Sequence, residues 1–201
     1  MSKYHIPDNE SEQEVLPNKM GITEKEEIGR EEAKGFARAE VILLEELTEG
    51  TTFDVEYIIR IHELALGHLY EFAGSYRTVN ISKGEFMFPA AKVLHQAMEE
   101  FAREMLAELP HQYQDASDLV RDIGRIHSEL LYIHPFREGN GRTARILANM
   151  MAYKAGYEGI DFQPIATNRK KKGAYIRGVQ EAVNKNYEPM IKLIDDLLST
   201  G

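Results

Sequence analysis

Apolar side chains recur at intervals of three and four along most of this chain, which is the spacing of one face of an α-helix. The first such segment follows Thr23 and Glu26, spaced as in a capping box, and ends at Gly50. Asp54 is a candidate N-cap for the next helix. Further helical spacing is found at about residues 90–109, 115–133, 143–155 and 172–184, and from Pro189 onward. This pattern predicts a mostly α fold.

One stretch departs from the helical spacing. Residues 77–82 alternate and are rich in β-branched side chains, Lys83-Gly84 offers a turn, and residues 85–88 are again apolar or aromatic. We expect a single β-hairpin here, over about residues 76–88. It could be an ordinary surface hairpin. Because an isolated hairpin leaves unpaired strand edges, it is also a candidate for pairing with an extended segment of a target protein.

The point at which helical spacing of apolar residues begins divides the chain into two predicted parts. Residues 1–20 lack periodicity and contain Pro7 and Pro17, so we expect an N-terminal arm. Residues 21–201 are enough for one sizeable core, and no internal repeat is present. The sequence predicts an arm followed by a single helical domain with one hairpin.

Composition restricts the partners of the domain. The net charge of −9 argues against broad binding to nucleic acid or to an acidic membrane, which needs a basic surface. The absence of cysteine excludes disulfides and thiolate metal sites. The N-terminus is polar and no apolar run approaches ~18 residues, so we expect a cytoplasmic protein. Export by a route without an N-terminal signal stays open.

The densest group of reactive residues is 134–145, His-Pro-Phe-Arg-Glu-Gly-Asn-Gly-Arg-Thr-Ala-Arg, between two predicted helices. Gly139 and Gly141 permit backbone angles that direct several N–H groups toward one point. A helix beginning near Asn140 adds its own unpaired N–H groups and the positive end of its dipole. Together these features predict a site for an anion such as a chain of phosphates.

The charged side chains of the same stretch extend this interpretation. Arg142 and Arg145 stand three apart on the predicted helix and can both face the anion. Glu138 would repel a phosphate unless Mg²⁺ lay between them. His134 has the ordinary pKa that suits proton abstraction near neutral pH. The stretch indicates phosphate-ester chemistry with a bound nucleotide, a metal ion and a base.

The histidines and the basic residues also have simpler structural interpretations. A lone histidine at a helix end is most often a cap, but the neighbours of His134 favour a base. His127, seven residues earlier, is expected to pack or to make a supporting hydrogen bond. His62 and His68 are six apart, whereas a helical zinc motif needs a separation of four. The basic run at residues 169–172 is more often a solvated loop than a nucleic-acid patch.

Residues 134–145 resemble the motif of the Fic (filamentation induced by cAMP) family, His-x-Phe-x-(Asp/Glu)-Gly-Asn-Gly-Arg-x-x-Arg, at every specified position. Members typically transfer AMP from ATP to a hydroxyl group of a target protein and release pyrophosphate. The resemblance implies a protein adenylyltransferase with His134 as general base, Glu138 as magnesium ligand and Phe136 buried. The nucleotide-binding residues that it implies here are Gly139, Asn140, Gly141, Arg142 and Arg145.

Two further regions resemble parts of the family. The hairpin is similar to the flap that holds the target protein beside the motif and contacts the nucleotide. This correspondence implies that Lys83 and Gly84 bind the nucleotide. Tyr175 corresponds in position to a tyrosine that packs against adenine in relatives.

An inhibitory sequence known in the family, (Ser/Thr)-x-x-x-Glu-(Gly/Asn), places its glutamate on the second motif arginine. Residues 23–28 and 52–57 approach this pattern, but each ends in a bulky residue instead of Gly or Asn. The departure implies that inhibition comes from a separate small antitoxin-like protein. Two other functions stay open: a different nucleotidyl or phosphoryl transfer, such as phosphorylation, and a non-catalytic module that binds a nucleotide and partners.

Overall fold

The computed structural model describes residues 15–198. Within them lie eight α-helices and one antiparallel hairpin, which confirms the expected mostly α fold. The helices are α1 (Lys25–Glu45), α2 (Val55–Leu66), α3 (Leu94–Phe101), α4 (Ala116–Ile133), α5 (Asn140–Lys154), α6 (Gln163–Thr167), α7 (Arg169–Glu181) and α8 (Glu188–Leu198). Short 3₁₀ turns are found at Ala91–Val93 and Ala182–Asn184, and a π-helical turn at Ala102–Leu106. The hairpin strands are β1 (Ser82–Lys83) and β2 (Phe86–Met87).

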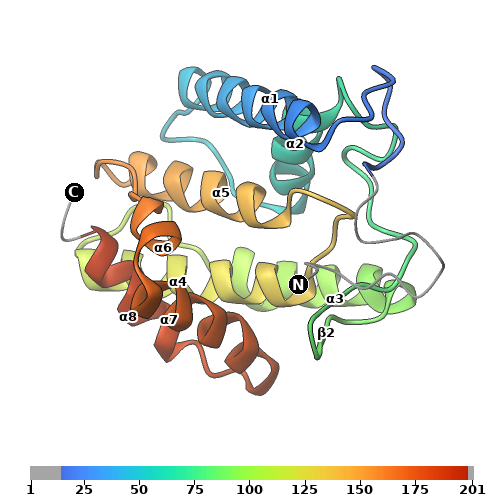
Figure 1. Cartoon of the computed structure of the whole chain (residues 1–201). Coiled ribbons are helices and arrows are strands. Elements are labelled where there is room, and N and C mark those ends of the chain that lie inside the picture. Colours follow the sequence, from blue (N-terminus) through green and yellow to red (C-terminus); the bar gives the residue numbers. More distant parts are fainter. Residues whose placement is uncertain (1–14, 199–201) are drawn as a thin grey trace.

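Helix α5 crosses the middle of the molecule (Figure 1). It packs against α1 and α2 on one side and against α4 on the other. Its side chains Leu147, Met150 and Ala152 are almost completely buried. Helices α7 and α8 cover α4 near the C-terminus, and α3 packs against α4 near the hairpin. A helix enclosed in this way is a rigid base for groups at its N-terminus.

The hairpin is shorter than the sequence predicted. Only Ser82 pairs with Met87 and Lys83 with Phe86, so the alternating residues 77–81 do not form a ladder strand. The pairing is extended by one bond, from the Phe88 N–H to the Ile81 carbonyl at 3.2 Å. The prediction of a strand from residue 77 was wrong because that segment bonds to the end of α4 instead.

The start of α1 also differs from the prediction. Thr23 was expected to cap the helix, but α1 begins at Lys25 and its N-cap position, Glu24, makes no side-chain capping bond. The Asn18 side chain accepts the Ile22 N–H at 2.9 Å, and this turn brings the chain to the helix in an extended form. The first fourteen residues of the expected arm lie outside the described part of the chain, and the boundary at residue 20 stays a prediction.

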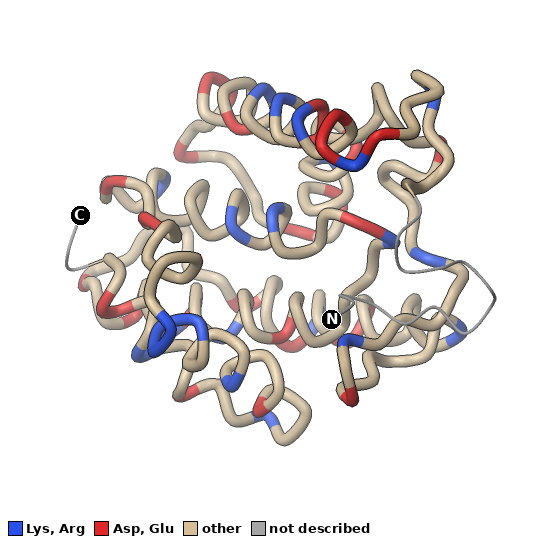
Figure 2. The backbone as a smooth tube through the Cα atoms, viewed as in Figure 1, with Lys and Arg blue, Asp and Glu red and all other residues tan. Residues whose placement is uncertain are grey.

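Helix α7 begins earlier than expected. The Asn168 side chain accepts the N–H groups of Lys170 and Lys171 at 2.9 and 3.2 Å and so acts as an N-cap. The basic run at residues 169–172 is therefore the first turn of α7 and not a loop, and it forms a visible cluster of positive charge (Figure 2). The predicted start near residue 172 was wrong because the sequence analysis did not take Asn168 as an N-cap. None of the helices within residues 15–198 has both the length and the apolar character needed to cross a membrane.

Helices α4 and α8 approach each other closely at Gly124. A Cβ atom at Gly124 would lie 2.7 Å from the Ile191 Cα and 3.0 Å from the Ile191 N, so the two backbones must separate. We expect Gly124→Ala to lower the free energy of unfolding by about 1–3 kcal/mol, measured by denaturant titration. In the control Gly29→Ala, at an exposed position of α1, the new Cβ meets nothing within 4 Å. That control should be stabilising by about 0.5–1 kcal/mol, and equal stability of the two variants would contradict the close approach.

Candidate active site

A cavity of about 1360 Å³ opens between the N-terminus of α5, the hairpin, and parts of α1 and α7. The predicted site residues that line it are Lys83, His134, Glu138, Gly139, Asn140, Gly141, Arg142, Arg145 and Tyr175. Gly84 does not line it, because it is exposed in the hairpin turn with a φ of 61°. The fold thus gathers every predicted site residue except Gly84 around one space.

The loop between α4 and α5 is closed by one side chain. The Asn140 Oδ1 accepts the Phe136 N–H at 2.8 Å, and the Asn140 Nδ2 donates to the Phe136 carbonyl at 2.7 Å. Phe136 is completely buried, as expected, and stacks on His62 with ring centroids 3.9 Å apart. Asn140 therefore contributes its side chain to the shape of the loop, and only its backbone N–H remains for an anion.

The loop requires glycine at one of its two glycine positions. Gly139 has a φ of 78°, and a Cβ there would lie 2.9 Å from Phe36 and 3.0 Å from Leu66. At Gly141 a Cβ would meet only the Arg145 Nη1, at 3.5 Å, which is an ordinary contact. Packing against Phe36 and Leu66 therefore explains why residue 139 is a glycine. Gly141 keeps the cavity open beside the α5 amides, where a ligand could approach closely.

His134 ends α4 in a left-handed conformation, with a φ of 53°, and only 7% of it is exposed. Its Nδ1 lies 3.0 Å from the Leu131 carbonyl. Since a carbonyl can only accept, Nδ1 carries the proton and the neutral ring has its lone pair on Nε2. Burial lowers the pKa of His134 to about 4, and the nearby charges of Arg77 and Lys83 act in the same direction. The ring is therefore neutral at pH 7 and can accept a proton.

The start of α5 carries the backbone N–H groups that were predicted to bind an anion. The helix's first internal bond runs from the Thr143 N–H to the Gly139 carbonyl at 2.9 Å. By helix geometry, the N–H groups of Asn140, Gly141 and Arg142 have no intrahelical acceptor. The Gly139 N–H donates to the Glu138 Oε1 at 2.8 Å. The role of Gly139 in nucleotide binding stays a prediction.

The first motif arginine, Arg142, has two carboxylate partners and an aromatic one. Arg142 pairs with Glu32 of α1 at 2.8 Å and with Glu138 at 3.3 Å, and it lies over the Phe36 ring at 4.5 Å. The Tyr70 hydroxyl donates to Glu32 at 2.5 Å, and burial together with this bond raises the pKa of Tyr70. Glu32 was not identified from the sequence, because nothing in its spacing along α1 links it to a residue 110 positions later.

Arg77 was likewise missed, although it fixes the hairpin relative to the motif. It is 4% exposed, and its Nε donates to the His134 carbonyl at 2.8 Å. Other guanidinium nitrogens donate to the carbonyls of Val79 at 2.7 Å and Pro89 at 2.5 Å, at the two ends of the hairpin segment. The Arg77 N–H also donates to the Pro135 carbonyl at 2.8 Å. Nothing in the alternating sequence around Arg77 indicates that its side chain joins the hairpin segment to the motif.

His62 supports the loop from the opposite side. The Gly74 N–H donates to the His62 Nδ1 at 2.9 Å, so the other ring nitrogen, Nε2, donates to the Glu138 carbonyl at 3.0 Å. Burial lowers the pKa of His62 to about 4 and so preserves this neutral form. The sequence analysis had excluded a zinc motif at His62 but had not predicted its contact with the loop.

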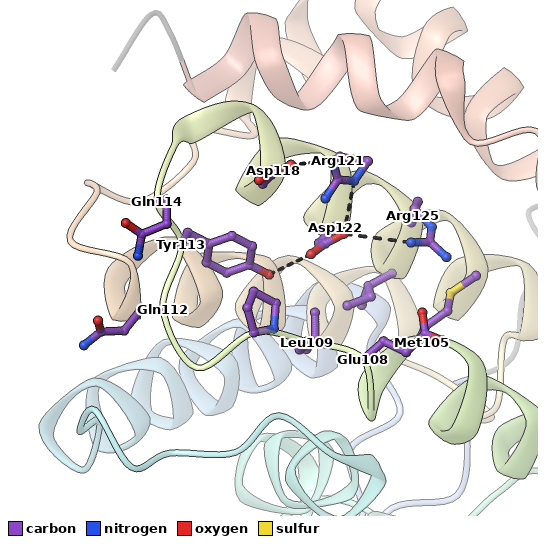
Figure 3. Close-up of a pocket in the computed structure, with 12 residues that line it drawn as sticks. Met105, Glu108, Leu109, Gln112, Tyr113, Gln114, Asp118, Arg121, Asp122 and Arg125 are labelled. Carbon is purple, nitrogen blue, oxygen red and sulfur yellow. Dashed lines mark hydrogen bonds and ion pairs between the residues drawn. The ribbon is translucent and has the colours of Figure 1, made fainter.

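A second cavity, of about 390 Å³, lies beside the N-terminal half of α4 (Figure 3). None of the predicted site residues lines it. Asp122 is the centre of its charged groups: it accepts the Tyr113 hydroxyl at 3.2 Å and lies 3.6 Å from Arg121 and 3.9 Å from Arg125. The candidate site is therefore confined to the larger cavity.

The buried histidines make stability depend on pH. Burial lowers the pKa of His62 and His134 to about 4 and that of His127 to about 3, from an ordinary value of 6.5. Below pH 6.5 the unfolded chain binds protons that the folded chain does not. The stability present above pH 6.5 should therefore be lost as the pH falls toward 4, by up to ~1.4 kcal/mol per pH unit for each histidine.

Denaturant titrations between pH 7.5 and 5 would measure this slope. In His62→Gln the slope should fall by about a third, one of the three buried histidines having been removed. The exposed His111 offers a control, since His111→Gln should leave the slope unchanged. A parent protein equally stable at pH 7.5 and 5 would contradict the neutral buried rings.

Comparisons with known proteins place this site in a family. A model of the Fic/DOC family matches residues 52–152. The chain is 29% identical over 181 residues to "Protein adenylyltransferase Fic" of Nematostella vectensis and 31% identical over 160 residues to "Protein adenylyltransferase VbhT" of Bartonella schoenbuchensis. These alignments cover 90% and 78% of this chain but only 39% and 33% of those proteins.

Solved structures share the fold. The N-terminal FIC domain of the effector protein Bep8 from Bartonella sp. 1-1C superposes with a TM-score of 0.77 at 23% identity, covering 92% of this chain and 90% of that one. BepC of Bartonella tribocorum, solved with bound AMPPNP, gives a TM-score of 0.72 at 20% identity, covering 91% of each chain. The family model matches half of the chain and includes the whole 134–145 loop. This chain belongs to the Fic/DOC family.

Proposed function

We propose that this chain is a protein adenylyltransferase, which transfers AMP from ATP to a hydroxyl group of a target protein. The observation that supports this most is the neutral His134 ring, with its lone pair on Nε2, in the same cavity as the first N–H groups of α5. Curated relatives at 25–31% identity are named protein adenylyltransferases, and the neighbour BepC binds an ATP analogue.

In the proposed reaction, the His134 Nε2 accepts the proton of a Ser, Thr or Tyr hydroxyl of the target. The hydroxyl oxygen forms a bond to the α-phosphorus of ATP, and the bond from that phosphorus to the pyrophosphate oxygen breaks. Pyrophosphate leaves with the electron pair of the broken bond. The Nδ1 contact with the Leu131 carbonyl at 3.0 Å holds the ring in the form that can do this.

Negative charge that grows on the phosphate oxygens has fixed donors nearby. The N–H groups of Asn140 and Gly141 point out of the N-terminus of α5, where the helix dipole favours an anion. Gly141 has no side chain to obstruct that approach. We assign Arg142 and Arg145 to the outer phosphates, since both line the cavity. Lys83, in the hairpin wall of the cavity, is assigned to the nucleotide as well.

Glu138 is the residue that we assign to Mg²⁺. Its carboxylate lines the cavity, and its Oε1 already accepts bonds from the Gly139 N–H and from Arg142. One carboxylate together with substrate phosphates and water is the usual environment of Mg²⁺ in nucleotide sites. When bound, the ion would neutralise charge on the phosphates and help to orient them.

The target protein is expected to dock on the hairpin at residues 77–88. Met87 of β2 is 62% exposed, and β2 pairs with β1 alone in the described part of the chain. An extended target segment could add to such an edge and place its hydroxyl beside His134. We also propose a separate small inhibitor protein, because neither residues 23–28 nor 52–57 match the inhibitory sequence.

Removal of the base tests the proposal. His134→Ala should reduce transfer of label from α-³²P-ATP to proteins of a cell lysate by at least ~100-fold, while calorimetry still detects ATP binding. The exposed His111→Ala serves as control and should transfer label as well as the parent does. Undiminished labelling by His134→Ala would exclude this residue as the base.

The position of the label separates the alternative reactions. Labelling from γ-³²P-ATP in place of α-³²P-ATP would indicate phosphorylation. ATP binding without label transfer by the parent, at every pH and with every lysate tried, would favour a non-catalytic binding module. Absence of ATP binding by the parent would contradict the proposed function itself.

A further inference from the structure

The ring of His134 packs against the end of the hairpin segment. The rings of Phe88 and His134 are stacked, with centroids 3.9 Å apart and an interplanar angle of 22°. Phe88 is 7% exposed, as His134 is, and both residues line the large cavity. Phe88 therefore covers one face of the imidazole, and in a closely packed interior the imidazole can turn only if Phe88 moves with it.

Phe88 is itself held in place by its neighbours. Its N–H donates to the Ile81 carbonyl at 3.2 Å. The Phe86 ring meets the Phe88 ring edge-on at a centroid distance of 5.2 Å, and it also meets the ring of Tyr132, on α4, at 6.5 Å. Edge-to-face contacts between aromatic rings are favourable at such distances. The hairpin thus presents a fixed, flat surface to His134.

Other contacts fix the backbone and the tautomer of His134. The Arg77 Nε donates to the His134 carbonyl at 2.8 Å, and the His134 Nδ1 donates to the Leu131 carbonyl at 3.0 Å. The torsion that turns an imidazole about its Cβ–Cγ bond has broad minima, so these contacts alone leave the ring some freedom. The stacked ring of Phe88 narrows that freedom, and it comes from the same hairpin segment as Arg77.

We propose that Phe88 is a positioning residue whose ring fixes the plane of the His134 imidazole and so directs Nε2 to the place where the target hydroxyl must lie. The inference rests on the proposed function, in which Nε2 accepts the proton of that hydroxyl. It gives the hairpin a second role, because the segment that is expected to dock the target also orients the base. A hairpin that only docks the target needs no stacking on His134.

Phe88→Leu tests this role, because leucine fills much of the same space but has no flat ring. We expect the rate of label transfer from α-³²P-ATP to lysate proteins to fall roughly 10–100-fold. The affinity for Mg·ATP, measured by calorimetry on the full chain, should not change, since the α5 amides and the motif arginines are unaltered. Phe88→Tyr keeps the ring and should retain most of the labelling. A loss in Phe88→Tyr as large as in Phe88→Leu would overturn the inference.

Phe53→Leu is the matched control. Phe53 is also 7% exposed and also meets an aromatic ring edge-on, that of Tyr57 at 5.2 Å, but it does not line the large cavity. This variant loses the same atoms from a buried position and should label lysate proteins as the parent does. An equal loss of labelling in Phe53→Leu and Phe88→Leu would indicate general structural damage and would overturn the inference.

A titration without nucleotide or target separates this inference from the proposed function. Burial lowers the pKa of His134 to about 4, and the charges of Arg77 and Lys83 act in the same direction. In NMR titrations of the nucleotide-free protein, this pKa should rise toward 6.5 in Phe88→Leu, because water reaches the uncovered face of the ring and stabilises its charged form. It should stay low in Phe88→Tyr and in Phe53→Leu.

The titration also separates orientation of the base from docking of the target. An unchanged pKa of His134 in Phe88→Leu would overturn the inference even if labelling falls, since the hairpin would then only dock the target. A parent that labels no protein would contradict the proposed function, and the titration would still decide whether Phe88 holds the His134 ring.

Discussion

The site depends on the pair of hydrogen bonds between the Asn140 side chain and the backbone of Phe136, at 2.8 and 2.7 Å. They join the start of α5 to the loop that leaves α4, so the amides of one helix and the histidine at the end of the other are held in one geometry. A buried amide with both of its polar atoms bonded is costly to disrupt, since each orphaned group would lose its partner without regaining water. The left-handed turns at His134 and Gly139 complete the loop on either side.

Buried neutral histidines serve a common purpose around this loop. His62, His127 and His134 each have one ring nitrogen against a backbone carbonyl, which assigns the proton to that nitrogen and leaves the other as an acceptor. Burial lowers the pKa of each ring, so that the assigned form persists at neutral pH. For His62 and His127 the second nitrogen accepts from another part of the protein. His134 lines the large cavity.

The helices and the motif could be predicted from the sequence because their signals are local. Helical spacing, the Asp54 cap and the glycine-bracketed Asn140 all act within a few residues. Arg77 and Glu32 could not be found in this way, since their partners lie 57 and 110 positions away. The hairpin was overestimated for the same reason: residues 77–81 have the composition of a strand, but the hydrogen bonds of Arg77 to distant carbonyls prevent that pairing.

The two motif arginines line the same cavity, but they have different surroundings. Arg142 is held by two carboxylates, Glu32 and Glu138, so a phosphate that reaches it must compete with groups of its own charge. Arg145 lies near the buried ring of His127; burial lowers the pKa of that ring, and the charge of Arg145 contributes to the lowering. In the proposed reaction, binding of the triphosphate to Arg142 would therefore weaken the contact that Glu32 makes between α1 and α5.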